Sequence, residues 1–373
     1  MIYSGSLWQR FDYLLFGVTI LLTIFGILMI ASATQDAIDP TIITRVPDQI
    51  RFAVLGLFLM VGFALLDYRI LSGLHTWLYL LMIILLLMVF AFGVEGDAGA
   101  QSWINVGIRI QPSEVAKVVI ILTLGHFLAR NYEKMNNPAT LLMSLIHIGI
   151  PAFLILIQPD LGMVTVIAAI WGMMIWGAGL PMKYIAIAGL VMGLVGGVVL
   201  LQAFNVIDGP LEDYQVSRIS TFLSPESDED AFFNIRQALT SVGSGGLVGK
   251  GYSVGTQNKG RFLRVRHTDF IFSVIAEEFG FVGSVVTLGL IGFVLMRILD
   301  GARRAVDAYG SLICYGVAAF IFFQTVTSIG MNLQLVPVTG LTLPFISSGG
   351  TSLLSTMVGI GLAQSVIARR RRV

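Results

Sequence analysis

Residues 243–280 read GSGGLVGKGYSVGTQNKGRFLRVRHTDFIFSVIAEEFG, passing from a glycine-rich, basic loop into an apolar run long enough to enter a bilayer. Asp269 lies at the changeover, directly after His267 and Thr268. A carboxylate at this point lies where a membrane helix begins, at the boundary between lipid and water. Such a boundary suits chemistry on lipid-linked anionic substrates, so the placement of the other polar motifs becomes informative.

The composition of the chain predicts a polytopic membrane protein. Of its 373 residues, 56% are hydrophobic and 12% charged, with a mean hydropathy of +0.85, whereas soluble domains carry about 25% charged residues. Membrane helices need about 20 mostly apolar residues. Ten segments qualify, the second and sixth being short: 13–33, 52–66, 74–93, 113–129, 138–157, 163–178, 184–204, 270–296, 309–330 and 350–368. We expect an all-α fold with about ten transmembrane helices in a single domain, residues 1–373.

The distribution of lysine and arginine predicts that both termini are cytoplasmic, because cytoplasmic loops are enriched in these residues. With the N-terminus inside, the short outer loops hold three basic residues, Arg45, Arg51 and Arg109. The inner side holds twelve: Arg10, Arg69, Arg130, Lys134, Lys183, Arg297, Arg303, Arg304, Arg369, Arg370, Arg371 and Arg372. A long outer loop, residues 205–268, then joins the seventh and eighth helices.

Within this loop, Phe232, Ile235, Leu239 and Val242 recur at helical spacing and predict an amphipathic helix. Such a helix lies on the outer membrane surface or packs on its own protein, and the spacing does not separate the two. Residues 231–268 also carry six basic residues and no acidic one, so the basic half of the loop leads directly to Asp269.

Charged residues in apolar segments are costly and are candidates for function. Glu114 and Lys117 share a helix face at the outer end of the fourth span and can form an ion pair. Pairing alone explains them, and a role beside Asp269 explains them as well. Asp269 is itself either a helix N-cap or a general base, two compatible roles.

Glu277 and Glu278 follow Asp269 within the same apolar run. In a continuous helix they lie about 12 Å deeper than Asp269. We favour a structural role for both, each bonded to neighbouring helices, because this depth is too great for a reaction at a lipid headgroup.

Two further motifs lie on the predicted outer face. QPDLG at 158–162 predicts a tight turn. The link 332–352 is apolar yet rich in proline and glycine, which indicates backbone entering the membrane beside a cavity or a plain buried linker. Together with Asp269 and the Glu114–Lys117 pair, these motifs predict a polar, partly basic site facing the outer leaflet.

Several other classes of site are excluded. The single cysteine, Cys314, cannot form an intrachain disulfide, and no cysteine–histidine cluster has metal-site spacing. The glycine-rich run departs from a nucleotide-binding P-loop, because Gly251 follows Lys250 where serine or threonine is required. Nothing in the sequence indicates a nucleic-acid partner.

Five stretches resemble the SEDS family (shape, elongation, division and sporulation), and the resemblance covers essentially the whole chain. They are HTDFIFSVIAEEFGFVG (267–283), GSGGLVGKG (243–251), QPSEVAK (111–117), QPDLG (158–162) and PVTGLTLPFISSGGTS (337–352). AEE at 276–278, and Thr339 before Gly340, favour the elongation branch of the family over its division branch.

The resemblance implies a multi-pass protein of the bacterial cytoplasmic membrane that polymerises lipid II into glycan strands during cell-wall elongation. It implies a class B penicillin-binding protein as partner. It places the catalytic role on Asp269, supported by Glu114 and Lys117. The expected substrate-binding residues are Tyr214, Gln215, Arg218, Gln237 and Lys250, to which we add Gln111, Ser113 and His267 from the neighbouring motifs.

The implied reaction inverts the anomeric centre, so one base suffices and no covalent sugar intermediate forms. We expect Asp269 to be the base, and Arg218 or Lys250 to neutralise the leaving pyrophosphate. The sequence shows no cofactor, although a divalent cation, Mg²⁺ or Mn²⁺, could share that task. Two alternatives stay open: a lipid II flippase, and a non-catalytic scaffold for a penicillin-binding protein.

Overall fold

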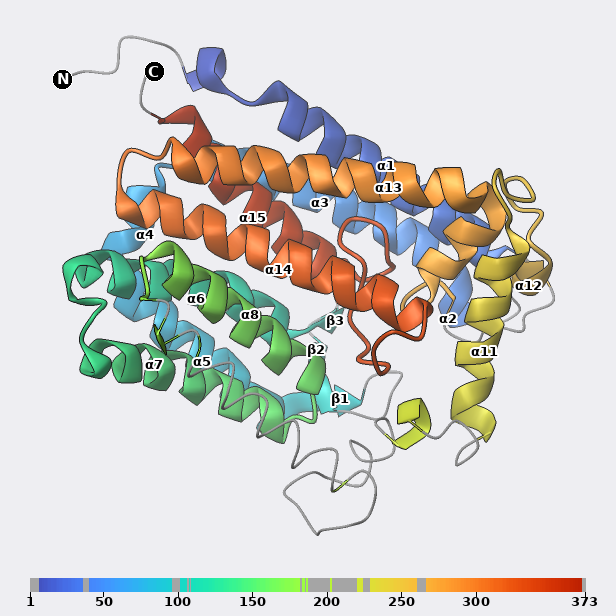
Figure 1. The fold of residues 1–373 in the computed structure, drawn as a ribbon, viewed down its shortest axis with the longest axis horizontal. Helices are drawn as coiled ribbons and strands as arrows, with labels where there is room; N and C mark the ends of the chain where they lie inside the picture. Colours follow the sequence, from blue (N-terminus) through green and yellow to red (C-terminus); the bar gives the residue numbers. More distant parts are fainter. Residues whose placement is uncertain are drawn as a thin grey trace.

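The computed structural model describes residues 7–35, 40–95, 101–105, 107, 109–181, 183–184, 186, 202, 220–223, 229–259 and 266–370. Most of them form long helices that lie side by side in a bundle (Figure 1). Eight described helices are long and apolar enough to cross a membrane: α1 (Tyr13–Thr34), α3 (Arg45–Leu65), α5 (His75–Phe92), α6 (Pro112–Arg130), α7 (Pro138–Ile157), α13 (Ile271–Arg303), α14 (Ala308–Asn332) and α15 (Gly350–Ala368). A further apolar helix, α8 (Leu161–Gly177), is shorter.

These helices confirm a mostly helical, multi-span fold. The predicted span 184–204 lies almost entirely outside the described residues, so the count of ten stays a prediction. The predicted span 52–66 is part of a longer helix, since α3 begins at Arg45. Arg45 and Arg51 therefore lie on helical turns and not in a loop, because the polar first turns of a membrane helix extend beyond its apolar window.

The connection between α5 and α6 contains a small antiparallel sheet that the sequence analysis did not predict. Its strands are β1 (Gly93–Glu95), β2 (Gln101–Asn105) and β3 (Arg109–Ile110), in the order β1-β2-β3. Strands this short carry no readable period. The sheet leads the chain into α6, and Gln111, the N-cap of α6, donates its backbone N–H to Thr351 Oγ1 at the start of α15, 3.3 Å away.

Short elements complete the two ends of the bundle. Three of them lie at the end of the bundle that carries Arg10, Arg69, Arg130, Arg297 and Arg369, here called the basic end: η1 (Leu7–Arg10), α4 (Tyr68–Gly73) and η2 (Tyr132–Lys134). α2 (Pro40–Ile43), α11 (Glu229–Ser244) and α12 (Thr256–Lys259) lie at the opposite end, here called the loop end (Figure 1).

The helices divide into an inner and an outer group. α6, α14 and α15 are buried on most of their surface, whereas α3, α5 and α7 expose apolar side chains on much of theirs, as lipid-facing helices do. α15 packs along α3. The two approach so closely that a Cβ at Gly361 would lie 2.5 Å from the Met60 carbonyl oxygen, which is the small-residue packing common between membrane helices.

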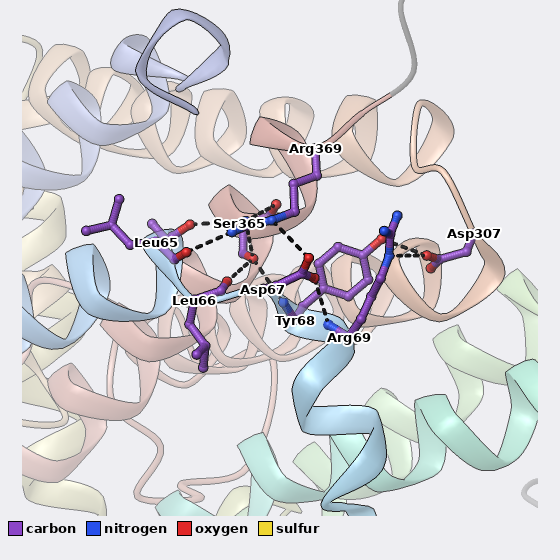
Figure 2. Close-up of polar contacts among 9 residues, drawn as sticks. Leu65, Leu66, Asp67, Tyr68, Arg69, Asp307, Ser365 and Arg369 are labelled. Atoms are coloured by element: carbon purple, nitrogen blue, oxygen red, sulfur yellow. Dashed lines mark hydrogen bonds and ion pairs between the residues drawn. The ribbon is translucent and has the colours of Figure 1, made fainter. Parts of the chain in front are cut away.

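At the basic end, polar contacts join the junction of α3 and α4 to the end of α15 and the start of α14 (Figure 2). Arg369 donates from Nη2 to the Leu65 carbonyl (2.7 Å) and from Nη1 to Ser365 Oγ (2.8 Å). Tyr68 donates its hydroxyl to Asp307 Oδ2 at 2.8 Å. Burial, followed by the Asp307 carboxylate, raises the pKa of Tyr68, so this phenol stays a donor.

α13 consists of two helical segments. Gly280 between them has φ 65° and ψ −160°, a backbone conformation open essentially to glycine alone. Residues 281–303 span about 34 Å at 1.5 Å per residue, enough to cross a bilayer unaided. Ile271–Glu278 are all buried in protein, whereas Phe281 and Val282 directly after the break are exposed.

This break corrects the expected position of the two glutamates. The segment that is long enough to cross the bilayer by itself begins only after Gly280, so Glu277 and Glu278 lie on the short segment that precedes the long span and not within it. Our preference for a structural role is supported, since Ser32 at the end of α1 donates a hydrogen bond to Glu278 Oε1.

Candidate functional site

Asp269 lies in a turn, residues 266–270, directly before the short segment of α13. Phe270 occupies the N-cap position of that segment. The interpretation of Asp269 as an N-cap is therefore wrong, because the helix starts one residue later than a capping aspartate requires. The side chain is partly exposed in a turn whose neighbours His267 and Phe270 are buried, as a reacting carboxylate in a protein pocket requires.

The link between α14 and α15 holds this turn by its backbone. The Ser348 N–H donates to the His267 carbonyl at 2.9 Å, and Ser347 Oγ donates to the Thr268 carbonyl at 2.8 Å. Gln49 of α3 in turn clamps the link, donating from Nε2 to the Ser347 carbonyl (3.3 Å) and accepting at Oε1 from the Gly349 N–H (3.4 Å). The turn is thus built onto a buried segment that enters the bundle.

The same link brings the QPDLG motif to Asp269. A Cβ at Gly340 would lie 4.0 Å from Asp269 Oδ2, and a Cβ at Gly162 would lie 2.7 Å from the Thr339 carbonyl oxygen. Residues 339–341 therefore lie between the start of α8 and the Asp269 turn. Two motifs far apart in sequence meet here, as the sequence analysis predicts for the outer face.

Gln111 and Ser113, two candidate substrate-binding residues, both contact Asp160. Gln111 Nε2 and Ser113 Oγ donate to Asp160 Oδ2 at 2.9 and 3.2 Å, while the Met163 N–H donates to Oδ1 at 3.0 Å. Burial raises the pKa of the Asp160 carboxyl, and these hydrogen bonds act against that rise. The two side chains therefore orient the carboxylate that caps α8.

The predicted ion pair in α6 is present. Lys117 Nζ lies 2.6 Å from Glu114 Oε2, and both side chains are almost fully buried. Two residues that the sequence analysis missed complete the site: Ser355 Oγ donates to Glu114 Oε2 (2.7 Å), and Lys117 donates to Gln324 Oε1 (3.2 Å). The Lys117 ammonium also lies 4.5 Å from the centroid of the Phe320 ring, a cation–π contact.

The glycine-rich loop pairs with α13 around Gly280. Its backbone N–H groups at Lys250 and Gly251 donate to the carbonyls of Glu277 (3.0 Å) and Glu278 (2.9 Å). The approach leaves no room for side chains at the contact, because a Cβ at Gly249 would lie 2.2 Å from the Glu278 carbonyl oxygen. The glycines thus serve close backbone packing.

Lys250 has all three ammonium donors engaged within the protein. Its Nζ lies 2.8 Å from Ser244 Oγ, from Thr256 Oγ1 and from Glu277 Oε1. An ammonium carries three N–H groups. In this conformation the side chain holds the loop together, and contact with a pyrophosphate stays a prediction that requires one of these donors to exchange its partner.

The remaining predicted substrate-binding residues lie in the turn itself, on α11, or outside the described residues. His267 is buried within the turn. Gln237 is half-buried on α11, whose residues Ile235 and Ala238 are buried and which packs on α13 and α14. The alternative in which this helix packs on its own protein is thereby confirmed. Tyr214, Gln215 and Arg218 lie outside the described residues.

A metal site built from protein ligands alone is not seen in the part of the chain that the structure describes. No group of three or more His, Cys, Asp or Glu side chains there could hold a metal ion. A divalent cation that binds together with a substrate pyrophosphate stays a prediction.

Comparisons with known proteins agree with the sequence resemblance. The model of the FtsW/RodA/SpoVE family, described as cell cycle protein, matches residues 12–372. The chain is 38% identical to the peptidoglycan glycosyltransferase MrdB of Escherichia coli over 324 residues, which covers 85% of this chain and 84% of that protein. It is 32% identical to the peptidoglycan glycosyltransferase RodA of Treponema pallidum, covering 96% and 98% of the two chains.

Solved structures share the fold. A chain of a peptidoglycan synthase complex, studied for the coordination of polymerization and crosslinking, superposes with a TM-score of 0.78 at 30% identity, covering 97% of this chain and 99% of that one. The rod shape determining protein RodA of Thermus thermophilus superposes with a TM-score of 0.68 at 29% identity, covering 98% and 99%.

Proposed function

This chain belongs to the FtsW/RodA/SpoVE family, and we propose that it is a peptidoglycan glycosyltransferase that polymerises lipid II. It is a multi-pass protein of the bacterial inner membrane. We place the reaction at the outer leaflet, during cell-wall elongation, because the basic residues predict that the loop end, with Asp269, faces away from the cytoplasm.

The observation that carries the proposal is the environment of Asp269. A partly exposed carboxylate stands on a turn whose two preceding carbonyls are hydrogen-bonded to the α14–α15 link. The motif at the start of α8 approaches the same link at Thr339, and the start of α6 contacts Thr351, in the first turn of α15 directly after the link. A base held this firmly can meet an incoming hydroxyl in one orientation, which is the main requirement for efficient proton transfer.

In the proposed reaction Asp269 takes the proton of the 4-hydroxyl of the incoming lipid-linked sugar. The hydroxyl oxygen forms a bond to the anomeric carbon of the growing glycan strand. The bond from that carbon to the pyrophosphate oxygen breaks, and its electron pair leaves with the polyprenyl pyrophosphate. The leaving group is a good one, so the chemistry needs one base and charge neutralisation, not a general acid.

The Glu114–Lys117 pair supports the site without reacting. Both charges are compensated within the bundle by each other, by Ser355 and by Gln324. A buried pair of this kind fixes the relative positions of α6, α14 and α15. The link that carries Ser347 and Ser348 joins α14 to α15, so the pair helps to hold the two helices between which that link runs.

A lipid II flippase is the second candidate, and the core of the described bundle argues against it. Between the Glu114–Lys117 pair and the basic end, α6 and α14 contribute buried apolar side chains to one continuous core, among them Ile121, Leu124, Val317 and Ile313. A path for a charged headgroup needs polar groups along its whole length. The other alternative, a non-catalytic scaffold for a penicillin-binding protein, gives the Asp269 carboxylate no role.

We further propose a class B penicillin-binding protein as partner. The support is the SEDS resemblance together with the similarity to a chain of a peptidoglycan synthase complex. Lipid II and the nascent glycan strand are the proposed substrates.

The deciding experiment measures glycan polymerisation from purified lipid II, with the partner present, for wild type, Asp269→Asn and Asp300→Asn. Asp300 is the control, because it lies at the basic end in an exposed pair with Arg304, 2.9 Å apart. We expect polymer from wild type and Asp300→Asn, and none from Asp269→Asn that still binds the partner. Polymer from all three would retain the enzyme and remove Asp269 as its base, whereas none from wild type would favour transport or scaffolding.

A further inference from the structure

The backbone of the Asp269 turn is held at a third point, by a side chain that the proposed function does not use. Asn332, the last residue of α14, donates from Nδ2 to the Asp269 carbonyl oxygen at 2.8 Å. With Ser348 on His267 and Ser347 on Thr268, three consecutive carbonyls accept hydrogen bonds from the end of α14 and the link that follows it.

The Asn332 side chain is fully buried, and its amide makes four hydrogen bonds. Nδ2 also donates to the Ser328 carbonyl (2.8 Å), while Oδ1 accepts from the Ser273 N–H (3.0 Å) and from Ser273 Oγ (2.6 Å). Two donors and two acceptor sites are the full capacity of an amide. Because two of its partners are backbone carbonyls and one is a backbone N–H, the orientation of the amide is determined by its contacts.

These contacts make Asn332 a cap supplied from another helix. A capping side chain normally belongs to the N-cap residue and accepts from an N–H of the first helical turn. Phe270 is the N-cap here and has no such side chain, and Asn332 Oδ1 accepts the Ser273 N–H in its place. The same amide grips the carbonyl of Asp269, so it bridges the turn and the helix that follows.

We propose that Asn332 is a positioning residue that sets the direction of the Asp269 carboxylate, an inference that rests on the proposed glycosyltransferase function. Fixing the Asp269 carbonyl and the Ser273 N–H relative to α14 removes the freedom of the peptide planes between them. The direction of the Cα–Cβ bond of Asp269 is then fixed. Misplacing a reacting group by about 1 Å can lower a rate by about 100-fold.

The first test compares Asn332→Ala and Asn332→Asp with Thr325→Ala. Asn332→Asp keeps the size and the acceptor for Ser273 but replaces the amide donor to Asp269. Thr325 is a control on the same helix, since its hydroxyl is buried and donates only to the Ile321 carbonyl (2.7 Å). We expect kcat to fall at least tenfold in both Asn332 variants, with the KM for lipid II within about twofold, and neither to change in Thr325→Ala.

The second test measures the exposure of the side chain at position 269 without an enzyme assay. Cys314 is the only cysteine of the chain, so Cys314→Ala with Asp269→Cys gives a single thiol in the turn. Its reaction rate with a water-soluble maleimide reports how the turn presents that side chain. We expect Asn332→Asp to change this rate at least threefold, and Thr325→Ala to leave it within the error of the double variant.

The outcomes separate the two proposals. An unchanged thiol reaction rate in an Asn332 variant that folds and binds the partner overturns the positioning role, whatever happens to activity. A normal kcat in both Asn332 variants overturns it as well. A wild type without polymerase activity removes the proposed function, while the thiol measurement still decides whether Asn332 holds the turn.

Discussion

The Nζ of Lys250 lies 2.8 Å from Oε1 of Glu277, and this contact joins the glycine-rich loop to the helical segment that follows Asp269. The same oxygen accepts from Thr256 Oγ1 (3.1 Å) and from the Gln257 N–H (3.0 Å). The Glu277 side chain is fully buried, whereas that of Lys250 is 26% exposed. The pair therefore fixes the shape of the loop before any substrate binds.

Replacing either member of this pair should destabilise the protein more than replacing both. Lys250→Met leaves a buried carboxylate without its cation, at a cost of about 3 kcal/mol, the low end for buried pairs because Lys250 is partly exposed. Lys250→Met with Glu277→Gln removes the charge as well and should restore part of the loss. Thermal unfolding in detergent measures both, and additive losses would show that the two side chains act independently.

The Glu114–Lys117 pair should show stronger coupling, because neither side chain is exposed. We expect Glu114→Gln or Lys117→Met alone to cost about 3–5 kcal/mol, and the double variant to cost less than the sum. Asp300→Asn and Arg304→Gln form the matched control, since exposed pairs contribute about 0.2–1 kcal/mol. A coupling no larger than that of the control pair would contradict the buried network seen around Lys117.

Gly280→Ala should destabilise the protein by about 1–3 kcal/mol, because an L-residue is strained at its backbone conformation. A Cβ there would also lie 2.4 Å from the Gly249 backbone nitrogen. Gly289→Ala in the long segment is the control, since a Cβ at that position meets nothing within 4 Å. Alanine should stabilise a helix there by up to about 1 kcal/mol. Equal unfolding temperatures for the two variants would argue against the break at Gly280.

Arg369→Lys should lower stability while leaving the specific polymerase rate unchanged, because Arg369 follows α15 at the basic end (Figure 2), whereas Asp269 lies in the turn before α13 at the loop end. Its planar guanidinium reaches Ser365 and the carbonyls of Ala64 and Leu65 simultaneously. A lysine ammonium cannot reproduce that fork. We expect a loss of about 1–3 kcal/mol in unfolding measurements, with Arg304→Lys as the exposed control. A selective loss of polymerisation would instead connect the basic end to the reaction.

The sequence identified the charged members of the site and missed the neutral ones. Glu114 and Lys117 were recognisable because charges are rare in apolar segments. Gln324, Ser355 and Asn332 lie in helices that contain other buried polar residues, and only the packing of α6 against α14 and α15 shows which of these residues meet a charge. Such partners depend on tertiary structure, which single-sequence patterns do not contain.

Helix bounds were likewise predictable where local sequence sets them and not where a tertiary contact does. The last span was predicted at 350–368 and is α15, Gly350–Ala368, because its apolar run is bounded by glycines and arginines. The break in α13 was missed, since Gly280 looked like one of many glycines in an apolar run. The loop GSGGLVGKG, which packs against the break, is recognisable in the sequence, yet its pairing with Glu277 and Glu278 is a long-range contact.

The burial of the inner helices also bears on how the protein is made. α6 and α15 have the lowest mean hydropathy of the eight candidate spans, because protein and not lipid surrounds most of their surface. Helices of marginal hydropathy partition poorly into a bilayer as isolated segments during synthesis. α15 packs along α3, which leaves the ribosome long before it. We therefore expect membrane insertion of α15 to depend on contact with helices that have already entered the membrane, α3 among them.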